Sequence, residues 1–476
     1  PDYYVQAGTE DAQRIYYRLQ QLPAYIHSAT HVFIGTRTCD IFSSMMVNAW
    51  TSASNCSRIY NNSFSSARFA EALPLSHSKN LELDEGKGTL WNSMYLYWLL
   101  LDKLENSDEP TLRLKHDAPS QMDRLKPALH SRNERMAGTG QEAWNHACDM
   151  CCWVQKGDDG STRLALRSVV VDGITIGRPC CSSHDCKKPL ESVKDRFCAK
   201  HDVLNQCCEV DCVAQVEPGF RTCADSGHRA LETYLCEANK AMFQLQLRLK
   251  RNGLAQPGEH DVNSDSDVEV DDEIDSEVCD GKPGRGNKTV KARFGRRRTH
   301  NEETCVGSCG VMLGRATFYG SEAPNGVREF LKGLFPTKAS VPGVIWHDNN
   351  CKIQAMLKND DDDTDRNHFA ACAMPVDVFH FKSKHKETDE FCNQNCNALL
   401  WDELKTEDGN WRFNSSAAEQ SNVWFGGFQA LVREMEATRY DFFLDEMVKL
   451  RNRILIRELE KKGKAPYSIP RADLLS

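Results

Sequence analysis

The chain has 476 residues, of which 40% are hydrophobic, which is enough for about two to four compact units and argues against global disorder. A formal net charge of −9 argues against a nucleic-acid enzyme, but eleven acids and no Lys or Arg lie between Glu259 and Asp280, so the rest of the chain is close to neutral. The 21 cysteines are an odd number and alternate with histidines in the middle of the chain, which favours zinc sites over a secreted disulfide framework.

Residues 1–165 are expected to be mostly helical. Apolar residues recur at helical spacing in Thr9–Leu22, Ile41–Trp50 and Leu90–Leu104. The longest apolar run, Trp91–Leu101, is interrupted by polar residues and too short to cross a bilayer, so it predicts a buried helix. Because no signal peptide is visible, we expect a soluble, intracellular protein without a membrane partner. The absence of an initiator Met suggests a processed chain or a fragment.

The segment Ser168–Gly177 (SVVVDGITIG) changes the character of the chain, because β-branched apolar residues predict a buried central strand. We therefore place the first strand of an α/β core at 166–178. A cysteine-rich insertion (179–236), a helix (237–254) and an acidic then basic disordered linker (255–298) are expected to follow. In 299–460 the predicted strands are Cys309–Tyr319, Pro342–His347 and Val376–Lys382, and the predicted helices are Pro324–Leu334, Ser416–Met435 and Phe442–Glu460.

Three acids stand out by their context: Asp172 in the middle of a strand, Asp348 at a strand end and Glu419 near a helix start. An ionised acid in an apolar strand is costly unless its charge is compensated, and a divalent metal compensates it naturally. Two Asp on adjacent strands and a Glu on a packed helix would supply the hard oxygen ligands of a two-metal phosphoryl-transfer site. Each acid alone also fits a structural role, as a turn, a helix cap or a first-turn charge. Asp158 or Asp159 is the alternative to Asp172.

Two sets of cysteines and histidines in the insertion have the spacing of zinc ligands. The expected ligands are Cys180, Cys186, Cys198 and His201 in the first set, and Cys208, Cys212, Cys223 and His228 in the second. Cys181, Cys207 and Cys236 are left over, so either set could shift by one residue. The segment has few large aliphatic residues, and bound metal would therefore provide much of its folding energy.

Two further groups are less complete. The sequence HACDMCC supplies His146, Cys148, Cys151 and Cys152, which amount to half of a zinc site. Downstream, we expect zinc at His380, His385, Cys392 and Cys396. Alternatively, His380 reaches the carboxylates, or all four side chains are core packing.

Four segments of the second half carry a resemblance to a known family. They are RRRTHNEETCVGSCGVMLGRATFYGSEAPNGVREFL, VIWHDNNCK, VDVFHFKSKHKETDEFCNQNCNA and WRFNSSAAEQSNVWFGGFQALVREM. Together they resemble the fungal Kyakuja-Dileera-Zisupton (KDZ) transposases and the cysteine-cluster proteins associated with them. The resemblance extends from near the start of the chain to about Arg453 and is most specific from Arg296 onward. Ala398 departs from the Pro expected at its position.

The resemblance implies an RNase H-like, integrase-type core with a mixed sheet, interrupted by the zinc-binding insertion. It also implies that Asp172, Asp348 and Glu419 form a DDE triad that binds Mg²⁺ or Mn²⁺ and catalyses DNA cleavage and strand transfer. The alternative is a domesticated zinc-dependent DNA-binding or regulatory protein without nuclease activity.

The expected partner is double-stranded DNA, as transposon ends and as target. Phosphate contacts are expected from Arg296, Arg297 and Arg298 in the basic stretch, unless that stretch is a solvated linker. Arg315 and Lys352 lie beside predicted strands of the site and could also touch phosphate, or be solvated. The DNA substrate predicts nuclear residence, and a homodimer is one option.

Overall fold

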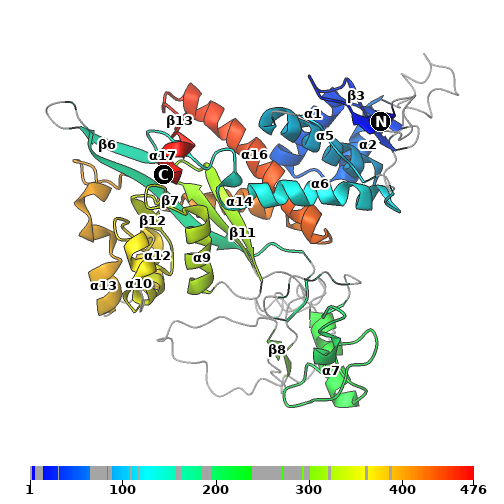
Figure 1. Ribbon diagram of the computed structural model, residues 1–476. Coiled ribbons are helices and arrows are strands. Elements are labelled where there is room, and N and C mark those ends of the chain that lie inside the picture. The colour runs from blue at the N-terminus through cyan, green and yellow to red at the C-terminus, as the bar shows by residue number, and fades with distance from the viewer. Residues whose placement is uncertain are drawn as a thin grey trace, which may run out of the picture. The chain divides into compact units, whose positions relative to one another are not determined.

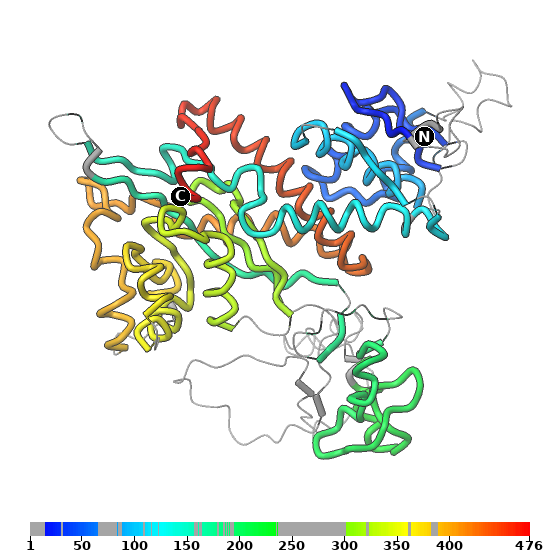
Figure 2. The backbone as a smooth tube through the Cα atoms, viewed as in Figure 1, coloured from blue at the N-terminus to red at the C-terminus, as the bar shows by residue number. Residues whose placement is uncertain are grey.

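The computed structural model describes residues 3–5, 14–29, 32–64, 83, 88–107, 110–115, 117–156, 160, 162–178, 180–183, 186, 188, 190, 195–238, 270–271, 292–293, 301–319, 323–359, 363–384 and 389–476. The chain forms two compact units. Unit 1 contains Pro1–Ile174, Glu302–Ala316 and Ala323–Ser476, and unit 2 contains Thr175–Asn301 and Thr317–Glu322. Unit 2 is therefore an insertion into the chain of unit 1, whose path is traced in Figure 2.

The centre of unit 1 is a five-stranded mixed sheet built around β7 (Thr162–Ile174). Its order is β11 (Met312–Phe318), β10 (Asn301–Gly307), β7 and β12 (Val344–Trp346), with β6 (Cys152–Lys156) paired to the first half of β7 (Figure 1). β10 is antiparallel to β7, with Thr304 opposite Asp172, whereas β12 is parallel to it, with Trp346 opposite Val170. The predicted strand around Asp172 is confirmed as the central strand of a mixed α/β unit.

Helices cover this sheet and extend unit 1. They are α1 (Thr36–Ala49), α2 (Ala53–Phe64), α5 (Thr89–Asn106), α6 (Gln121–Met136), α9 (Pro324–Leu334), α10 (Asn350–Lys358), α11 (Thr364–His368), α12 (Val378–Lys384), α13 (Glu390–Asn395), α14 (Ala417–Gly426), α15 (Gln429–Val432), α16 (Ala437–Lys461) and α17 (Arg471–Leu475). The small strand pairs are β1 (Tyr3–Val5) with β2 (Arg14–Tyr16), β3 (Tyr25–Ala29) with β4 (Val32–Gly35), and β5 (His146–Ala147) with β13 (Tyr467–Ser468). Short 3-10 turns in the described part of unit 1 are Gly138–Gly140, Ala398–Leu400 and Asp402–Leu404, and unit 2 has one at Asp202–Leu204.

The long helix α16 joins the sheet to the helical part of unit 1. Asn452 holds the edge strand β11, because its side chain accepts from the backbone N–H of Met312 and donates to the Met312 carbonyl (2.9 and 2.8 Å). Near the start of α16, Phe442 and Phe443 pack edge-on against aromatic residues of α5. Burial of such large aromatic side chains supplies much of the stabilising free energy of a core.

Most predicted helices are confirmed, and α9 has the predicted bounds, but three predictions are wrong in part. Arg14–Tyr16, inside the predicted helix Thr9–Leu22, is a strand. Val376–Lys382 is largely helical rather than extended, because Asp377 Oδ1 accepts the backbone N–H groups of Phe379 and His380 and so begins α12. The predicted helix Ser416–Met435 is broken after Gly426 into α14 and α15. None of the helices that the structure describes could cross a membrane.

Unit 2 has little regular structure. It holds α7 (Ser226–Ala238) and the short pair β8 (Val270–Asp271) with β9 (Ala292–Arg293). Its buried cluster consists of Cys181, Cys186 and Cys198, with Leu190 and Phe197 packed against them. A core made mainly of thiols buries too little apolar surface to fold on the hydrophobic effect alone. The cysteines that the structure describes are free thiols.

Candidate carboxylate and metal sites

The first two predicted acids lie on adjacent strands at the same level of the sheet. β12 runs parallel to β7 with Trp346 opposite Val170, and each Asp follows two residues later, Asp348 after Trp346 and Asp172 after Val170. Between them, His347 Nδ1 lies 3.2 Å from the Val171 carbonyl oxygen, which continues the contact of the two strands. The parallel register therefore brings together two residues that are far apart in sequence.

The third acid is on a helix that is fastened to the same strand. Asn422 Nδ2, one turn after Glu419 on α14, donates to Asp172 Oδ2 (2.9 Å). Thr304 Oγ1 donates to Asn422 Oδ1 (3.1 Å) and lies 3.0 Å from the Asp172 carbonyl oxygen. Residues three apart lie on the same helix face, so the contact that anchors Asn422 also turns Glu419 toward the sheet.

His380 connects two of the acids. Its Nδ1 lies 2.7 Å from Asp348 Oδ1, and its Nε2 lies 3.3 Å from Glu419 Oε1. Asp377 Oδ1 is a further neighbour of Nδ1, at 3.2 Å. The imidazole is 10% exposed, whereas the Glu419 side chain is 40% exposed. His380 therefore belongs with the carboxylates, one of the two alternatives to the predicted zinc site.

The three acids approach one another through Asn422 and His380. Within the described part of the chain, they are not among the groups whose ligand atoms all lie within 4.8 Å of one another. Sequence reasoning did not single out Asp377 and Asn422, although an Asp just before a helix and an Asn one turn from an acid are recognisable signals. The alternatives Asp158 and Asp159 lie outside the described residues.

The first cysteine group of unit 2 contains Cys181, Cys186, Cys198 and His201. The Sγ atoms of Cys186 and Cys198 are 3.8 Å apart, and His201 Nδ1 is 3.4 Å from Cys181 Sγ. Two sulfurs of a tetrahedral zinc site, with Zn–S near 2.3 Å, are separated by about 3.8 Å. The group therefore has the dimensions of a zinc site.

The predicted ligand Cys180 is wrong by one residue, because Cys181 joins this group in its place. Cys180 and Cys181 are consecutive residues outside any helix, where neighbouring side chains point in different directions, so only one of them can face the other three ligands. Burial raises the pKa of the Cys180 thiol to about 11, which keeps it neutral.

The second group contains Cys207, Cys212, Cys223 and His228, and the prediction of Cys208 is likewise wrong by one residue. Cys208 Sγ instead accepts from Arg196 Nη1 (3.1 Å). The Sγ atoms of Cys212 and Cys223 are 3.9 Å apart, again the spacing of a tetrahedral site. The Asp225 backbone N–H, and then the His228 side chain, lower the pKa of Cys223 to about 7, which favours the thiolate that metals bind.

A third group lies in unit 1 and consists of His146, Cys148, Cys151 and Cys309. The half-site predicted from HACDMCC is thus completed by Cys309 rather than by Cys152. No ligand spacing in the sequence indicates Cys309, because it follows β10, far along the chain from Cys148 and Cys151.

The predicted downstream zinc site is not assembled as expected. His380 lies with the acids, and His385 lies outside the described residues. Cys392 and Cys396 are fully buried beside Val376, as core residues are. Neither cysteine is in a metal-ligand group of the described residues.

Of the arginines predicted to contact phosphate, the structure describes only Arg315. Arg296, Arg297 and Arg298 lie outside the described residues. Arg315 is buried and does not face solvent, because its Nη1 donates to Glu302 Oε2 and its Nε to Asp445 Oδ1, both at 2.9 Å. The idea that Arg315 touches phosphate is therefore wrong.

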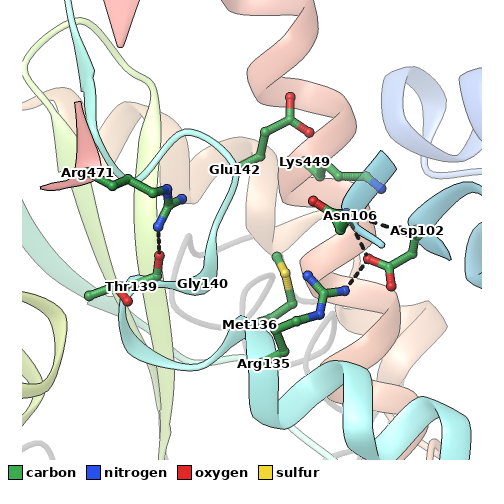
Figure 3. Close-up of a pocket in the computed structure, with 9 residues that line it drawn as sticks. All are labelled: Asp102, Asn106, Arg135, Met136, Thr139, Gly140, Glu142, Lys449 and Arg471. Carbon is green, nitrogen blue, oxygen red and sulfur yellow. Dashed lines mark hydrogen bonds and ion pairs between the residues drawn. The ribbon is translucent and has the colours of Figure 1, made fainter. Parts of the chain in front are cut away.

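A separate pocket of about 330 Å³ lies among α5, α6, α16 and α17 (Figure 3). Figure 3 shows Arg135 directed at Asp102 and Arg471 at the Thr139 carbonyl oxygen. These charged groups already satisfy one another, and no predicted site residue lines the pocket. It therefore has the features of a polar interface between packed helices rather than of a ligand-binding site.

Comparison with known proteins gives two family matches. Residues 1–64 match a family model described as a CxC5 like cysteine cluster associated with KDZ transposases, and residues 170–234 match one described as a CxC6 like cysteine cluster associated with KDZ transposases. The second range holds Asp172 and both cysteine groups of unit 2, whereas Cys39 and Cys56 of the first range are buried thiols outside the three groups. No curated protein and no solved structure matches the chain.

Proposed function

We propose, from the assignment of this chain to the KDZ-type transposases by its two cysteine-cluster matches, that it is a DNA transposase with a DDE active site on an RNase H-like core. Asp172, Asp348 and Glu419 are the proposed ligands of two Mg²⁺ or Mn²⁺ ions. The observation that carries the proposal is the convergence of three remote elements, β7, β12 and α14, on one end of the sheet.

The sheet supports this core type. β7 has an antiparallel neighbour on one side and a parallel one on the other, the mixed pairing expected of an RNase H-like core. The acids lie at the carboxyl ends of β7 and β12, where the side chains of parallel strands meet. An ionised carboxylate at the end of a buried strand is costly unless its charge is compensated, and a divalent cation would compensate it. His380 lies between Asp348 and Glu419, with its Nδ1 2.7 Å from Asp348 Oδ1 and its Nε2 3.3 Å from Glu419 Oε1, which supports a shared site for these two acids.

The chain's own residues would position the reaction rather than form a covalent intermediate. Bound divalent ions would activate the attacking oxygen and stabilise the leaving 3′ oxygen of a DNA phosphodiester. The aspartates sit on rigid strands, and Asn422 fixes the Asp172 carboxylate by donating to Oδ2. Asp377 begins α12 and so holds His380 against Asp348 and Glu419. The 40% exposure of the Glu419 side chain leaves this side of the site open to a DNA backbone.

The direct test is cleavage of labelled transposon-end DNA by purified protein with Mg²⁺ or Mn²⁺. Asp348→Ala should lower the rate more than about 100-fold, because even the loss of a residue that only hydrogen-bonds to a metal ligand costs about 10–100-fold. Glu434→Ala is the matched control, since this acid is exposed and remote from the site, and it should cleave like wild type. Equal cleavage by Asp348→Ala and wild type would remove Asp348 from the mechanism.

Asn422 offers a second test that does not delete a proposed ligand. Asn422→Ala should raise the Mg²⁺ concentration needed for half-maximal cleavage about 10–100-fold, because the Asp172 carboxylate loses its donor. Gln420→Ala, an exposed neighbour on the same helix, should leave the Mg²⁺ dependence unchanged. The same Mg²⁺ dependence in both variants would contradict the positioning role.

The same protein preparations separate this function from the alternative, a zinc-dependent DNA-binding or regulatory protein. Wild-type protein that binds end DNA but leaves it intact with either metal would favour the alternative. Double-stranded DNA is the proposed partner in both cases, and nuclear residence and a homodimer are part of the proposal. A tagged protein confined to the cytoplasm would contradict the proposed location.

A further inference from the structure

We propose that His146, Cys148, Cys151 and Cys309 form a third, structural zinc site, which fastens the β10–β11 turn to the start of the core sheet. The four ligands lie outside both segments matched by the cysteine-cluster families. All four belong to unit 1, so the site is distinct from the two groups of the insertion.

The local backbone presents the first two thiols together. The N–H groups of Cys151 and Cys152 donate to the Cys148 carbonyl (3.0 and 2.8 Å), which closes a tight Cys-x2-Cys turn. The two Sγ atoms are consequently 3.6 Å apart, close to the spacing of two sulfurs on one zinc and much longer than a disulfide bond. Cys148 and Cys151 are each 1% exposed.

The third thiol comes from the hairpin turn between β10 and β11. Gly310 has φ +92°, a left-handed conformation that a glycine adopts without strain, and Gly307 N donates to the Val311 carbonyl across the turn. A Cβ at Gly307 would lie 3.2 Å from Cys309 Sγ and 3.6 Å from Cys151 Cβ. The absence of a side chain at this residue leaves room for Cys309 beside Cys151.

The histidine supplies an observation that points to a ligand. His146 is 3% exposed, and its Nε2 is buried without a hydrogen-bond partner among the residues that the structure describes. A buried imidazole nitrogen without a partner is costly, and coordination of a metal removes that cost. Three thiolates and one imidazole are a closed Cys₃His set, which is typical of structural rather than catalytic zinc.

Buried positive charge nearby fits the same interpretation. A zinc ion with three thiolates and a neutral imidazole has a formal charge of −1. Arg451 Nη1 donates to the Gly310 carbonyl in the turn (2.9 Å), and Arg167 on β7 pairs with Cys152 of β6, the residue after Cys151. Arg167 is 7% exposed; its Nη2 donates to the Trp144 carbonyl oxygen (3.1 Å), whereas its Nε and Nη1 have no hydrogen-bond partner among the described residues. A thiolate-bound zinc would supply the missing counter-charge.

The site would act on the strand that carries Asp172. Ser168 N on β7 donates to the Cys151 carbonyl (2.8 Å), and Ser308 N, beside Cys309, lies 3.2 Å from the Ser168 carbonyl oxygen. The Ser168 and Ser308 hydroxyl groups are 2.8 Å apart. Zinc would thus fix the end of the β7–β10 pairing opposite to the carboxylates.

The test is the zinc content of the purified full chain, measured by plasma mass spectrometry. Wild type should hold three zinc ions, and Cys309→Ser should hold two. Cys152→Ser is the matched control, because Cys152 adjoins Cys151 but is not in the group, and it should keep three. Two zinc ions or fewer in wild type, or three in Cys309→Ser, would overturn the site.

A second variant, which is expected to keep its metal, tests the site even if Cys309→Ser does not fold. His146→Cys would convert Cys₃His into Cys₄ and should keep three zinc ions. After exchange with Co²⁺, it should show stronger thiolate-to-metal absorption than wild type. An unchanged cobalt spectrum in soluble His146→Cys protein would show that residue 146 is not a ligand, and the proposed site would be wrong.

Discussion

Arg315→Met removes a positive group from a buried charge network while keeping a side chain of similar length. Arg315 is 5% exposed, and its guanidinium holds Glu302, which is 0% exposed, and Asp445, which is 8% exposed. Burial lowers the pKa of this guanidinium, but Asp445, Glu302 and Asp441 raise it well above its ordinary value, so Arg315 remains charged. Without it, Glu302 loses the contact with this guanidinium and keeps the hydrogen bond from the hydroxyl of Tyr440 (2.8 Å).

The expected loss of unfolding free energy follows from removing one partner of a buried ion pair. Breaking a buried ion pair by removing one partner costs about 3–5 kcal/mol. Arg132 still contacts Asp445 on its other oxygen, so the lower half of this range, about 3 kcal/mol, is expected. In the variant, Glu302 would take up a proton more readily, because a desolvated carboxyl group has a raised pKa. The deficit should therefore be smaller at low pH and grow as pH rises through that raised pKa.

The assay is urea unfolding followed by tryptophan fluorescence, with zinc present throughout and at several pH values. Arg433→Met is the matched control, because Arg433 is 56% exposed and its partner Glu434 is 67% exposed, and such pairs contribute at most about 1 kcal/mol. Equal losses of unfolding free energy in the two variants would refute the reasoning, as would a deficit in Arg315→Met that shrinks with rising pH.

Two remaining predictions concern ligand identity and helix placement. Cys181→Ser should lose about one zinc ion per chain while Cys180→Ser keeps its full content; the reverse result in metal analysis would restore the spacing-based assignment. Gly427→Ala should destabilise unit 1 by about 1–3 kcal/mol in thermal unfolding, because the new Cβ would lie 2.3 Å from Trp50 Nε1. Gly333→Ala, with open space around its Cβ, should be neutral or stabilising by up to about 1 kcal/mol; a comparable loss in both would rule out the steric explanation.

The sequence predicts the elements that local sequence determines, and it misses those that depend on contacts with distant residues. The β-branched apolar run of β7 and the Pro-initiated, amphipathic α9 were both recognisable locally. In contrast, β10 (NEETCVG) was missed, because two glutamates suggest a solvated segment. All seven residues are buried, and Glu302 is stabilised there by Arg315 and Tyr440, which no local pattern indicates.

For the zinc ligands, too, the local sequence is not sufficient, because it does not distinguish between two neighbouring cysteines. Cysteine spacing identified both groups in the insertion but could not choose between neighbours such as Cys207 and Cys208. The backbone direction makes that choice, and it points Cys208 Sγ toward Arg196 Nη1 instead. Cys309 was missed for a different reason, since only the turn between β10 and β11 brings it to Cys148 and Cys151.

The topology explains why the carboxylates are so widely spaced in sequence. β7 and β10 are antiparallel neighbours, which a short hairpin could connect, yet unit 2 is inserted between them. Closing a long loop costs only slightly more entropy than closing a short one, and metal-bound clusters would order the loop themselves. The insertion therefore lengthens the sequence distance between Asp172 and Asp348 without changing the register of β7 with β12. Along the chain Asp172 is far from the other two acids, whereas in the sheet it is the residue to which both Asn422 and the β10 partner Thr304 are bound.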